Sequence, residues 1–213
     1  MFSKFIHFAF LFAFQFFLLI FLFQMATEIA QRVDDLTLSD SGASTSNQKR
    51  KNVAGRYDIQ LGDITHHNVL QLRRLNQAVF PVTYNDKFYT EVISAGELAK
   101  YAYFNDVVVG AVCCRADAYN GKKAMYIMTL GTLAPYRQFG VGDMLLKHVF
   151  ALCRKDPAYE YIFLHVQVNN ETALHFYKRY GFTEQGVVEK YYKRIEPDDA
   201  YILVKNLKEK QFL

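Results

Sequence analysis

Three observations predict an α/β fold for this chain. Segments with the two-residue apolar period of strands alternate with segments that carry the apolar stripe of helices. A glycine-rich bend at residues 137–142 joins an apolar strand to an amphipathic helix. The region with this pattern, residues 57–213, has the length of one domain with a single core.

Three strands and two helices are predicted in the first half of this region. The strands cover residues 57–61, 98–104 and 107–115, and a turn at Asn105-Asp106 joins the last two. The first helix is indicated by an apolar stripe of Val69, Leu72, Leu75 and Val79. We expect Thr65 to cap this helix, Pro81 to end it and a second short helix to cover residues 86–93.

The alternation continues in the second half. An apolar strand is predicted over residues 123–133, and the helix after the bend presents Val141, Leu145, Val149 and Leu152 on one face. A buried strand over residues 161–168 and a helix over residues 171–180 follow. A strand pair near residues 183–190 and 200–207 completes the domain, and no internal repeat is visible.

The glycine-rich bend has the features of a phosphate site. Gly140 and Gly142 permit positive φ and close backbone approach, so the free N–H groups at the helix start can converge on an anion. Arg137 adds a cation at the rim. The alternative is a turn without a ligand, since short glycine patterns recur by chance.

The N-terminal segment differs from the rest in composition. Residues 5–23 are almost wholly apolar and close to the roughly 20 residues that cross a bilayer. Residues 1–25 are therefore a hydrophobic leader or membrane segment, with a signal peptide, a signal anchor and an extension upstream of Met25 as the alternatives. Residues 26–55 contain little to bury and are expected to form a disordered linker.

Cysteine usage and charge exclude several classes of site. Cys113, Cys114 and Cys153 form no C-x-x-C pair, so we predict neither a metal site nor a disulfide framework, and we expect a reducing compartment. The formal net charge of +4 suits a phosphate-bearing cofactor. No stripe of aromatic and basic residues indicates direct nucleic-acid binding.

Two ordered motifs carry a resemblance to the GCN5-related N-acetyltransferase (GNAT) family. Arg137-x-x-Gly140-x-Gly142 is similar to the family's acetyl-CoA pyrophosphate loop. The second motif runs from Asn170-x-x-Ala173 through Phe176-Tyr177 to Gly181-Phe182, on the helix that lines the family's cofactor channel. The resemblance implies a GNAT fold for residues 56–213, with a mixed central β-sheet of about seven strands flanked by about four helices.

Other segments resemble the NatE-type N-terminal protein acetyltransferases of this family. They are residues 80–89, 126–131, 133–137, 164–167 and 191–197. The hydrophobic N-terminus departs from that family, whose members begin near the first strand. The resemblance implies an acyltransferase that moves acetyl from acetyl-CoA to the α-amine of nascent peptides beginning with Met and a hydrophobic residue. Direct attack in a ternary complex is expected, because no cysteine occupies a motif position.

The resemblance makes Tyr126 and His165 the candidate catalytic residues. Acetyl transfer needs a neutral amine, so a base must remove a proton. His165 can titrate near neutral pH and interrupts an otherwise apolar strand, whereas Tyr126, with a phenol pKa near ~10, is expected to hold and polarise water. The alternatives are a core histidine and a half-buried strand tyrosine.

A larger set of residues is implied to bind acetyl-CoA. It comprises Leu130, Leu133, Arg137, Gln138, Phe139, Gly140, Val141, Gly142, Asp143, Asn170, Ala173 and Tyr177. Tyr177 is expected near the cofactor sulfur, with plain packing beside Phe176 as the alternative. Asn170 is expected to contact the pantetheine or to cap its helix.

The peptide-binding residues follow from the same resemblance. They are Phe80, Pro81, Val82, Tyr84, Met128, Tyr191 and Tyr192. Phe80, Pro81 and Val82 would form an apolar pocket for methionine, and the tyrosines would hold the peptide backbone. The alternative for residues 80–84 is a helix-ending loop whose aromatic rings cover the core.

Other functions use the same scaffold, namely lysine or small-amine acetylation, or a non-catalytic acetyl-CoA-binding subunit of the NatA assembly. The resemblance implies association with the auxiliary and catalytic subunits of NatA at the ribosome. Acetyl-CoA and nascent chains meet in the cytosol, so we expect a cytoplasmic, and also nuclear, protein translated from Met25. Residues 5–23 would instead contact or tether it to a membrane if residues 1–25 are retained.

Overall fold

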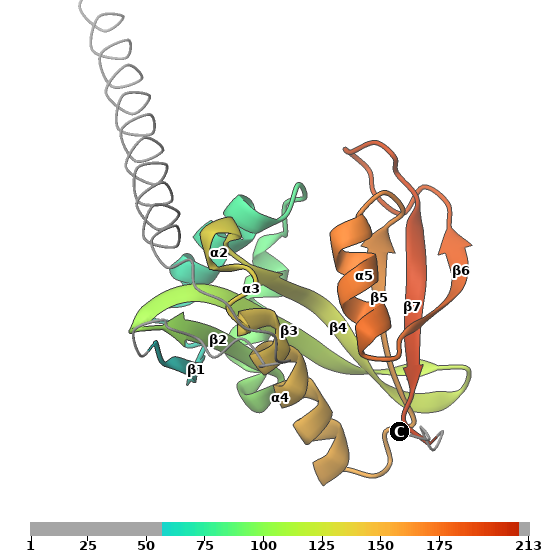
Figure 1. The fold of residues 1–213 in the computed structure, drawn as a ribbon, viewed down its shortest axis with the longest axis horizontal. Helices are drawn as coiled ribbons and strands as arrows, with labels where there is room; N and C mark the ends of the chain where they lie inside the picture. The colour runs from blue at the N-terminus through green and yellow to red at the C-terminus, as the bar shows by residue number, and fades with distance from the viewer. Residues whose placement is uncertain (1–56, 209–213) are drawn as a thin grey trace, which may run out of the picture. The chain divides into compact units, whose positions relative to one another are not determined.

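The computed structural model describes residues 57–208, in which seven strands form one mixed sheet with helices on both faces (Figure 1). The strands are β1 (Ile59–Asp63), β2 (Ala99–Phe104), β3 (Val107–Tyr119), β4 (Lys122–Thr132), β5 (Tyr161–Gln167), β6 (Thr183–Val188) and β7 (Ala200–Asn206). The helices are α2 (Val69–Val79), α3 (Asp86–Ile93), α4 (Val141–Lys155) and α5 (Glu171–Arg179). The predicted seven strands and four helices are confirmed for these residues.

Strands β1 to β4 form an antiparallel meander in sheet order, and the order then continues β5-β7-β6. Two tight turns hold the central hairpins. Asn105 and Asp106 both have positive φ, as do Asn120 and Gly121 between β3 and β4, which is the conformation that matches strand twist in two-residue loops. The second turn was not predicted, and because of it β3 extends to Tyr119 rather than ending at residue 115.

The start of α2 differs from the prediction. Thr65 does not cap the helix, which begins at Val69 with Asn68 at the cap position. The side chain of Asn68 accepts a hydrogen bond from the backbone N–H of Thr65 at 2.8 Å, so the pair closes the turn before the helix. The cap of α3 follows the usual rule, since Asn85 accepts from the N–H of Phe88 at 3.0 Å.

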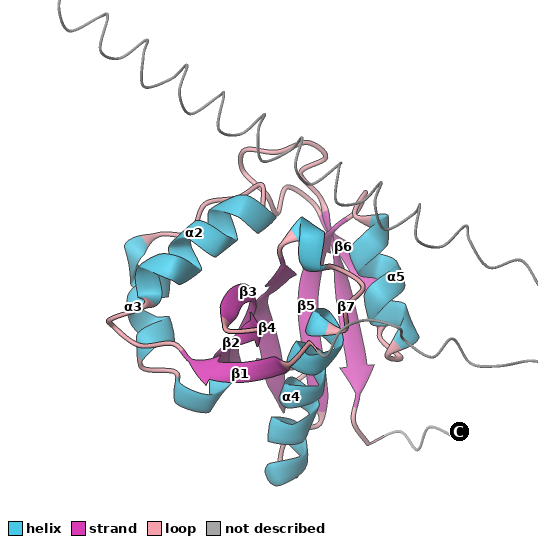
Figure 2. Cartoon of the chain, turned by 60° about the vertical axis from the view of Figure 1, so that its left-hand side comes forward, coloured by secondary structure: helices cyan, strands magenta, loops and turns pink. Residues whose placement is uncertain are grey.

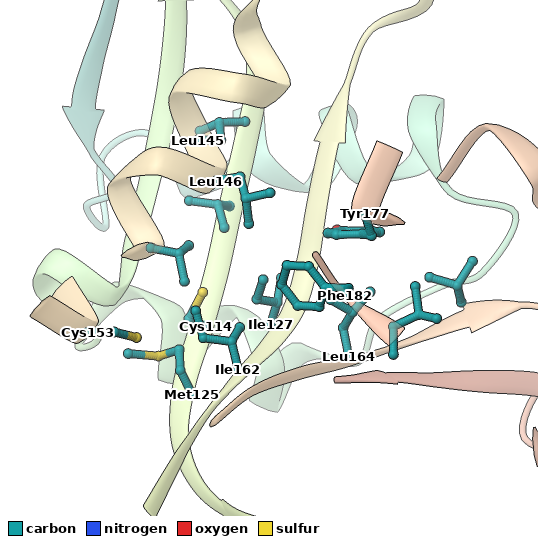
Figure 3. Packing of buried hydrophobic residues seen from close by; sticks show 14 of the residues in the cluster. Cys114, Met125, Ile127, Leu145, Leu146, Cys153, Ile162, Leu164, Tyr177 and Phe182 are labelled. Carbon is teal, nitrogen blue, oxygen red and sulfur yellow. The ribbon is translucent and has the colours of Figure 1, made fainter. Parts of the chain in front are cut away.

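The helices cover both faces of the sheet, with α2 and α3 on one side and α4 and α5 on the other (Figure 2). Helix α4 buries five side chains against the strands, namely Val141, Leu145, Leu146, Val149 and Cys153. Figure 3 shows Leu145 and Leu146 in one cluster with side chains of the central strands. Burial of each large aliphatic side chain stabilises the fold by about 1.5–3 kcal/mol.

The parallel contact between β4 and β5 is short, and this positions the site. Only three residue pairs connect the two strands, and the last is Tyr126 with Phe163. A bulge in β4 follows, because Cys113 pairs with Thr129 and Cys114 with Ile127, which leaves Met128 without a partner in β3. Beyond Tyr126 the two strands separate, and their side chains line opposite walls of a groove.

The predictions for residues 1–25 and 26–55, including the membrane segment, lie outside the described residues. None of the helices between residues 57 and 208 has the length and apolarity that crossing a bilayer requires.

Candidate active site

A groove of about 790 Å³ opens where β4 and β5 separate. Its walls come from these two strands, the segment after α2, helix α5 and the loop between β6 and β7, with single residues from β3 and α3. The groove is lined by both predicted catalytic residues, by all seven predicted peptide-binding residues and by four of the predicted cofactor-binding residues. These are Tyr126 and His165; Phe80, Pro81, Val82, Tyr84, Met128, Tyr191 and Tyr192; and Leu130, Asn170, Ala173 and Tyr177.

Within the groove, Tyr126 and His165 are in direct contact. The Tyr126 Oη atom lies 3.1 Å from His165 Nδ1 and 3.0 Å from the Oη atom of Tyr191. The ring of Tyr191 stacks on the imidazole with a centroid separation of 4.5 Å. A tyrosine from the β6–β7 loop therefore covers both candidate catalytic side chains.

Strand geometry explains this contact. Tyr126 is the last β4 residue paired with β5, and its partner Phe163 precedes His165 by two residues. Residues two apart on a strand share a face, so the Phe163 ring and the His165 ring lie on the same side. The Phe163 ring stacks on Tyr126 at 4.8 Å and holds the phenol beside the imidazole.

The surroundings set different protonation states for the two side chains. Burial lowers the pKa of His165 below its ordinary value, so the imidazole is neutral at physiological pH. Burial also raises the pKa of Tyr126, and the hydrogen bond to Tyr191 raises it further. Tyr126 is therefore a neutral phenol, and His165 is the group of the pair that can end a step with an extra proton.

An aromatic pocket lies at one end of the groove. Phe80 follows the last turn of α2, and its ring meets Tyr84 edge-on at 6.1 Å. Tyr84 stacks on Phe88 at 4.7 Å. Gly131 permits this arrangement, because a Cβ atom there would lie 2.7 Å from Val79 Cγ1 and 2.8 Å from Phe80 Cζ. The residues after α2 thus line the groove, although some of these rings also cover the core as the alternative reading expected.

The loop between β6 and β7 is held over the groove by hydrogen bonds at its base. The side chain of Gln167 donates to the carbonyl of Pro197 at 2.7 Å, and the Tyr192 N–H donates to the carbonyl of Asp198 at 2.8 Å. The Asp199 carboxylate accepts from the N–H of Lys190 at 2.9 Å. These contacts place Tyr191 and Tyr192 in the groove wall.

The glycine-rich bend forms the start of α4. Gly140 occupies the N-cap with φ +90°, a conformation that favours glycine, and no atom lies within 4 Å of the place of its missing Cβ. Its carbonyl accepts the first helical hydrogen bond, from the N–H of Met144 at 3.0 Å. The backbone N–H groups that precede Met144 in the helix are therefore available to a ligand. Gly142 has a second role, because a Cβ atom there would contact the Phe176 ring of α5 at 3.4 Å.

The remaining predicted cofactor residues lie in or next to this bend. They are Leu133, Arg137, Gln138, Phe139, Val141 and Asp143, and none of them lines the central groove. Val141 is buried in the core beneath α4, so its side chain cannot reach a ligand, although its N–H is at the helix end. Phe139 is 43% exposed and packs against Phe104. Asp143 meets Arg179 of α5 at 3.4 Å, which joins the two helices beside the bend.

Helix α5 contributes Asn170 and Tyr177. The Asn170 side chain caps the helix by accepting from the Ala173 N–H at 3.1 Å, as one of its two expected roles requires. Tyr177 is 5% exposed and packs against Phe176 and Phe182, yet it also lines the groove. Burial raises the pKa of Tyr177, so it faces the groove as a neutral hydrogen-bond donor.

Sequence reasoning missed several contributors to the groove. Arg115 places its guanidinium 5.0 Å from the centre of the Tyr126 ring. Phe163 supports Tyr126, and Gly131 makes room for Phe80. A glycine within a strand-like run is a signal for close backbone approach, so Gly131 had a detectable signature, whereas Arg115 and Phe163 had none.

The three cysteines are buried in the core and form no disulfide. Burial raises the pKa of Cys113 and of Cys153 to about 12, which removes their nucleophilic thiolate forms at neutral pH. In residues 57–208, no group of three or more His, Cys, Asp or Glu side chains is placed to hold a metal ion.

Comparison with known proteins gives consistent matches. The model of the acetyltransferase (GNAT) family matches residues 69–182. The N-alpha-acetyltransferase 50 of Danio rerio is 57% identical to this chain, in an alignment that covers 70% of this chain and 89% of the relative. The probable N-acetyltransferase san of Drosophila melanogaster is 55% identical, over 72% of this chain and 83% of the relative. Among solved structures, Arabidopsis thaliana Naa50 in complex with the bisubstrate analogue CoA-Ac-MVNAL is 47% identical. It has a TM-score of 0.65 over 70% of this chain and 98% of that one.

Proposed function

Because this chain belongs to the GNAT family of acetyltransferases, we propose that it transfers acetyl from acetyl-CoA to the α-amine of peptides that begin with methionine and a hydrophobic residue. The observation that carries this proposal is the Tyr126–His165 contact, which shares one groove with Phe80 and with residues of α5, the helix that contacts the start of α4. A donor held along α5 and an amine held beside Phe80 would meet at this pair.

The α4 end of the site suits the acetyl-CoA pyrophosphate. Amide groups before Met144 and the positive end of the helix dipole favour an anion there, and Arg137 supplies a nearby cation. Asn170, Ala173 and Tyr177 then line the groove towards the reacting centre. A relative that is 47% identical binds an analogue that contains CoA, which supports this placement.

The aromatic end of the groove suits the peptide. Phe80, Pro81 and Val82 offer an apolar wall that a methionine side chain can fill, and the hydroxyl groups of Tyr84, Tyr191 and Tyr192 lie around it. The peptide portion of the analogue bound to Arabidopsis Naa50, MVNAL, begins with methionine and valine. A hydrophobic second residue therefore fits the same groove.

The reaction needs one proton to leave the ammonium before attack and another to leave the nitrogen of the tetrahedral intermediate. Tyr126 accepts a proton from the ammonium as it passes its own proton to His165 Nδ1, so no free phenolate forms and the charge is on the imidazole. The amine nitrogen then bonds to the thioester carbon, and the C–S bond breaks. The thiolate takes up one proton to give CoA, and the second proton goes to solvent.

Direct transfer fits the position of the cysteines. Cys113, Cys114 and Cys153 are buried in the core and do not line the groove, so no thiol is placed to form an acetyl-enzyme. The acceptor amine must therefore attack acetyl-CoA while both substrates are bound.

A comparison of two peptides tests the proposal. One is a free Met-Leu peptide, and the other carries a blocked α-amine and an internal lysine. We expect acetyl-CoA-dependent mass gain of one acetyl group on the first peptide only. Transfer only to the lysine of the blocked peptide would support the alternative lysine acetyltransferase.

We also propose a cytosolic protein, translated from Met25, that associates with NatA subunits at the ribosome, where nascent N-termini emerge. The support is the nature of the substrates: acetyl-CoA and nascent chains meet in the cytosol. Mass spectrometry of the mature N-terminus together with cell fractionation tests location. Retention of residues 1–25 in a membrane fraction would contradict the cytosolic location. Co-purification of the tagged full chain with ribosomes tests the association with NatA subunits at the ribosome.

A further inference from the structure

The groove carries positive charge. Among residues 57–208, three cationic residues line the groove, Arg115, Lys193 and Arg194, and no aspartate or glutamate does. Arg115 is already paired, because its Nη2 atom lies 2.8 Å from Asp117 Oδ2. The uncompensated charge of the groove therefore belongs to Lys193 and Arg194 of the β6–β7 loop.

These two side chains are available to a ligand. Both are exposed, and within residues 57–208 neither forms an ion pair. The loop also contains acidic residues, Glu189, Glu196, Asp198 and Asp199, but none of them lines the groove. Exposed loop cations usually serve solvation alone, and their position in the groove wall sets this pair apart.

Lys193 and Arg194 lie within reach of the first residues of an extended peptide bound at Tyr126. Tyr191 is in contact with Tyr126, so its position marks the reacting amine. Lys193 and Arg194 follow by two and three residues, at the start of a run of bends at residues 193–197, so their Cα atoms lie at most roughly 7 and 11 Å from that of Tyr191. A bound peptide advances by about 3.3 Å per residue, so its third and fourth residues lie at a similar distance from the amine.

Resting on the proposed function, we propose that Lys193 and Arg194 select acceptor peptides with acidic side chains at their third and fourth positions. A carboxylate there would meet two cations, and a cationic side chain would meet like charge. Exposed ion pairs contribute about 0.2–1 kcal/mol each, which corresponds to roughly 1.4-fold to fivefold per pair. The preference therefore supplements the choice of methionine by the Phe80 pocket.

Three peptides that differ only at these positions test the inference: Met-Leu-Glu-Glu, Met-Leu-Gln-Gln and Met-Leu-Arg-Arg, each followed by the same neutral tail. Arginine is used rather than lysine to avoid a second amine. At saturating acetyl-CoA, we expect kcat/KM to fall in that order, by about threefold to tenfold between the extremes. The difference should shrink as salt is raised, because exposed charges are screened.

Charge reversal provides the second arm. Lys193→Glu with Arg194→Glu should invert the order of the three peptides and leave the melting temperature unchanged. The matched control, Arg74→Glu with Lys147→Glu, makes the same change in net charge at exposed positions outside the groove and should keep the wild-type order.

The outcomes separate this inference from the proposed function. If the wild-type protein acetylates none of the three peptides, the proposed function is wrong. If it acetylates all three equally at low salt, or if both double variants change the order alike, the function stands and the selective role of Lys193 and Arg194 is refuted.

Discussion

The hydroxyl oxygen of Tyr126 lies 3.1 Å from Nδ1 of His165, although 39 positions separate the two residues in the chain. The contact exists because β4 and β5 are parallel neighbours whose pairing ends at Tyr126. It joins a buried phenol to an imidazole that is neutral at physiological pH, and it faces the groove.

Loss of either member of the pair should remove most of the catalysis. We expect Tyr126→Phe and His165→Ala each to lower kcat by about 10²–10⁴-fold, the usual effect of losing acid–base catalysis. Because the residues act as one unit, the double variant should be little slower than the slower single variant. Tyr161→Phe, on β5 but outside the groove, is the control and should retain wild-type kcat. Multiplicative losses in the double variant would show independent roles.

The pH dependence of kcat should report His165. The imidazole accepts a proton only when neutral, so activity is present above its pKa and lost as pH falls through it. Burial lowers this pKa from the ordinary value near 6.5, which places the acidic limb of kcat below pH 6.5. Steady-state measurements at saturating concentrations of both substrates would locate the limb. A midpoint above pH 6.5, or a limb that persists in His165→Ala, would remove the imidazole from this step.

Gly140 can be tested against a glycine with the same conformation elsewhere. Gly140 and Gly121 have φ of +90° and +72°, and a Cβ atom at either would meet nothing within 4 Å. Alanine should therefore strain both positions by about 1–2 kcal/mol and lower both melting temperatures. Only Gly140→Ala should also raise KM for acetyl-CoA, by about twofold to thirtyfold, because it disturbs the amides at the start of α4. An equal effect of Gly121→Ala on KM would exclude a specific role of the bend.

Gly131 should control the shape of the methionine pocket. A Cβ atom there would come within 3 Å of Val79 and Phe80, so Gly131→Ala should displace the Phe80 ring and destabilise the fold by about 1–3 kcal/mol. We expect KM for a Met-Leu peptide to rise by about tenfold, the effect of a small misfit in an apolar pocket, with KM for acetyl-CoA unchanged. Gly62→Ala, which would crowd Tyr103 on β1 and β2, is the steric control. An unchanged peptide KM in Gly131→Ala would separate Phe80 from methionine binding.

The sequence by itself predicted the elements with local signals. The amphipathic helix after the bend, the Asn105-Asp106 turn and the strand that contains His165 follow from periods of two to four residues and from turn chemistry. Thr65 shows the limit of such rules, because Asn68 competes for the same turn and occupies the cap position. Local chemistry indicated the phosphate site at Arg137, Gly140 and Gly142, whereas the family resemblance identified the other site residues, and most of the predicted site residues line one groove.

The tertiary structure decided which of these residues meet. The Tyr126–His165 contact, the cover that Tyr191 provides and the room that Gly131 leaves for Phe80 all join residues far apart in the chain. The pKa directions of Tyr126 and His165 also come from burial, which depends on every element packed around the groove. Local sequence patterns determine which side of a strand or helix a residue occupies, but strand order and strand separation determine its neighbours. The chemistry of this site depends on those neighbours.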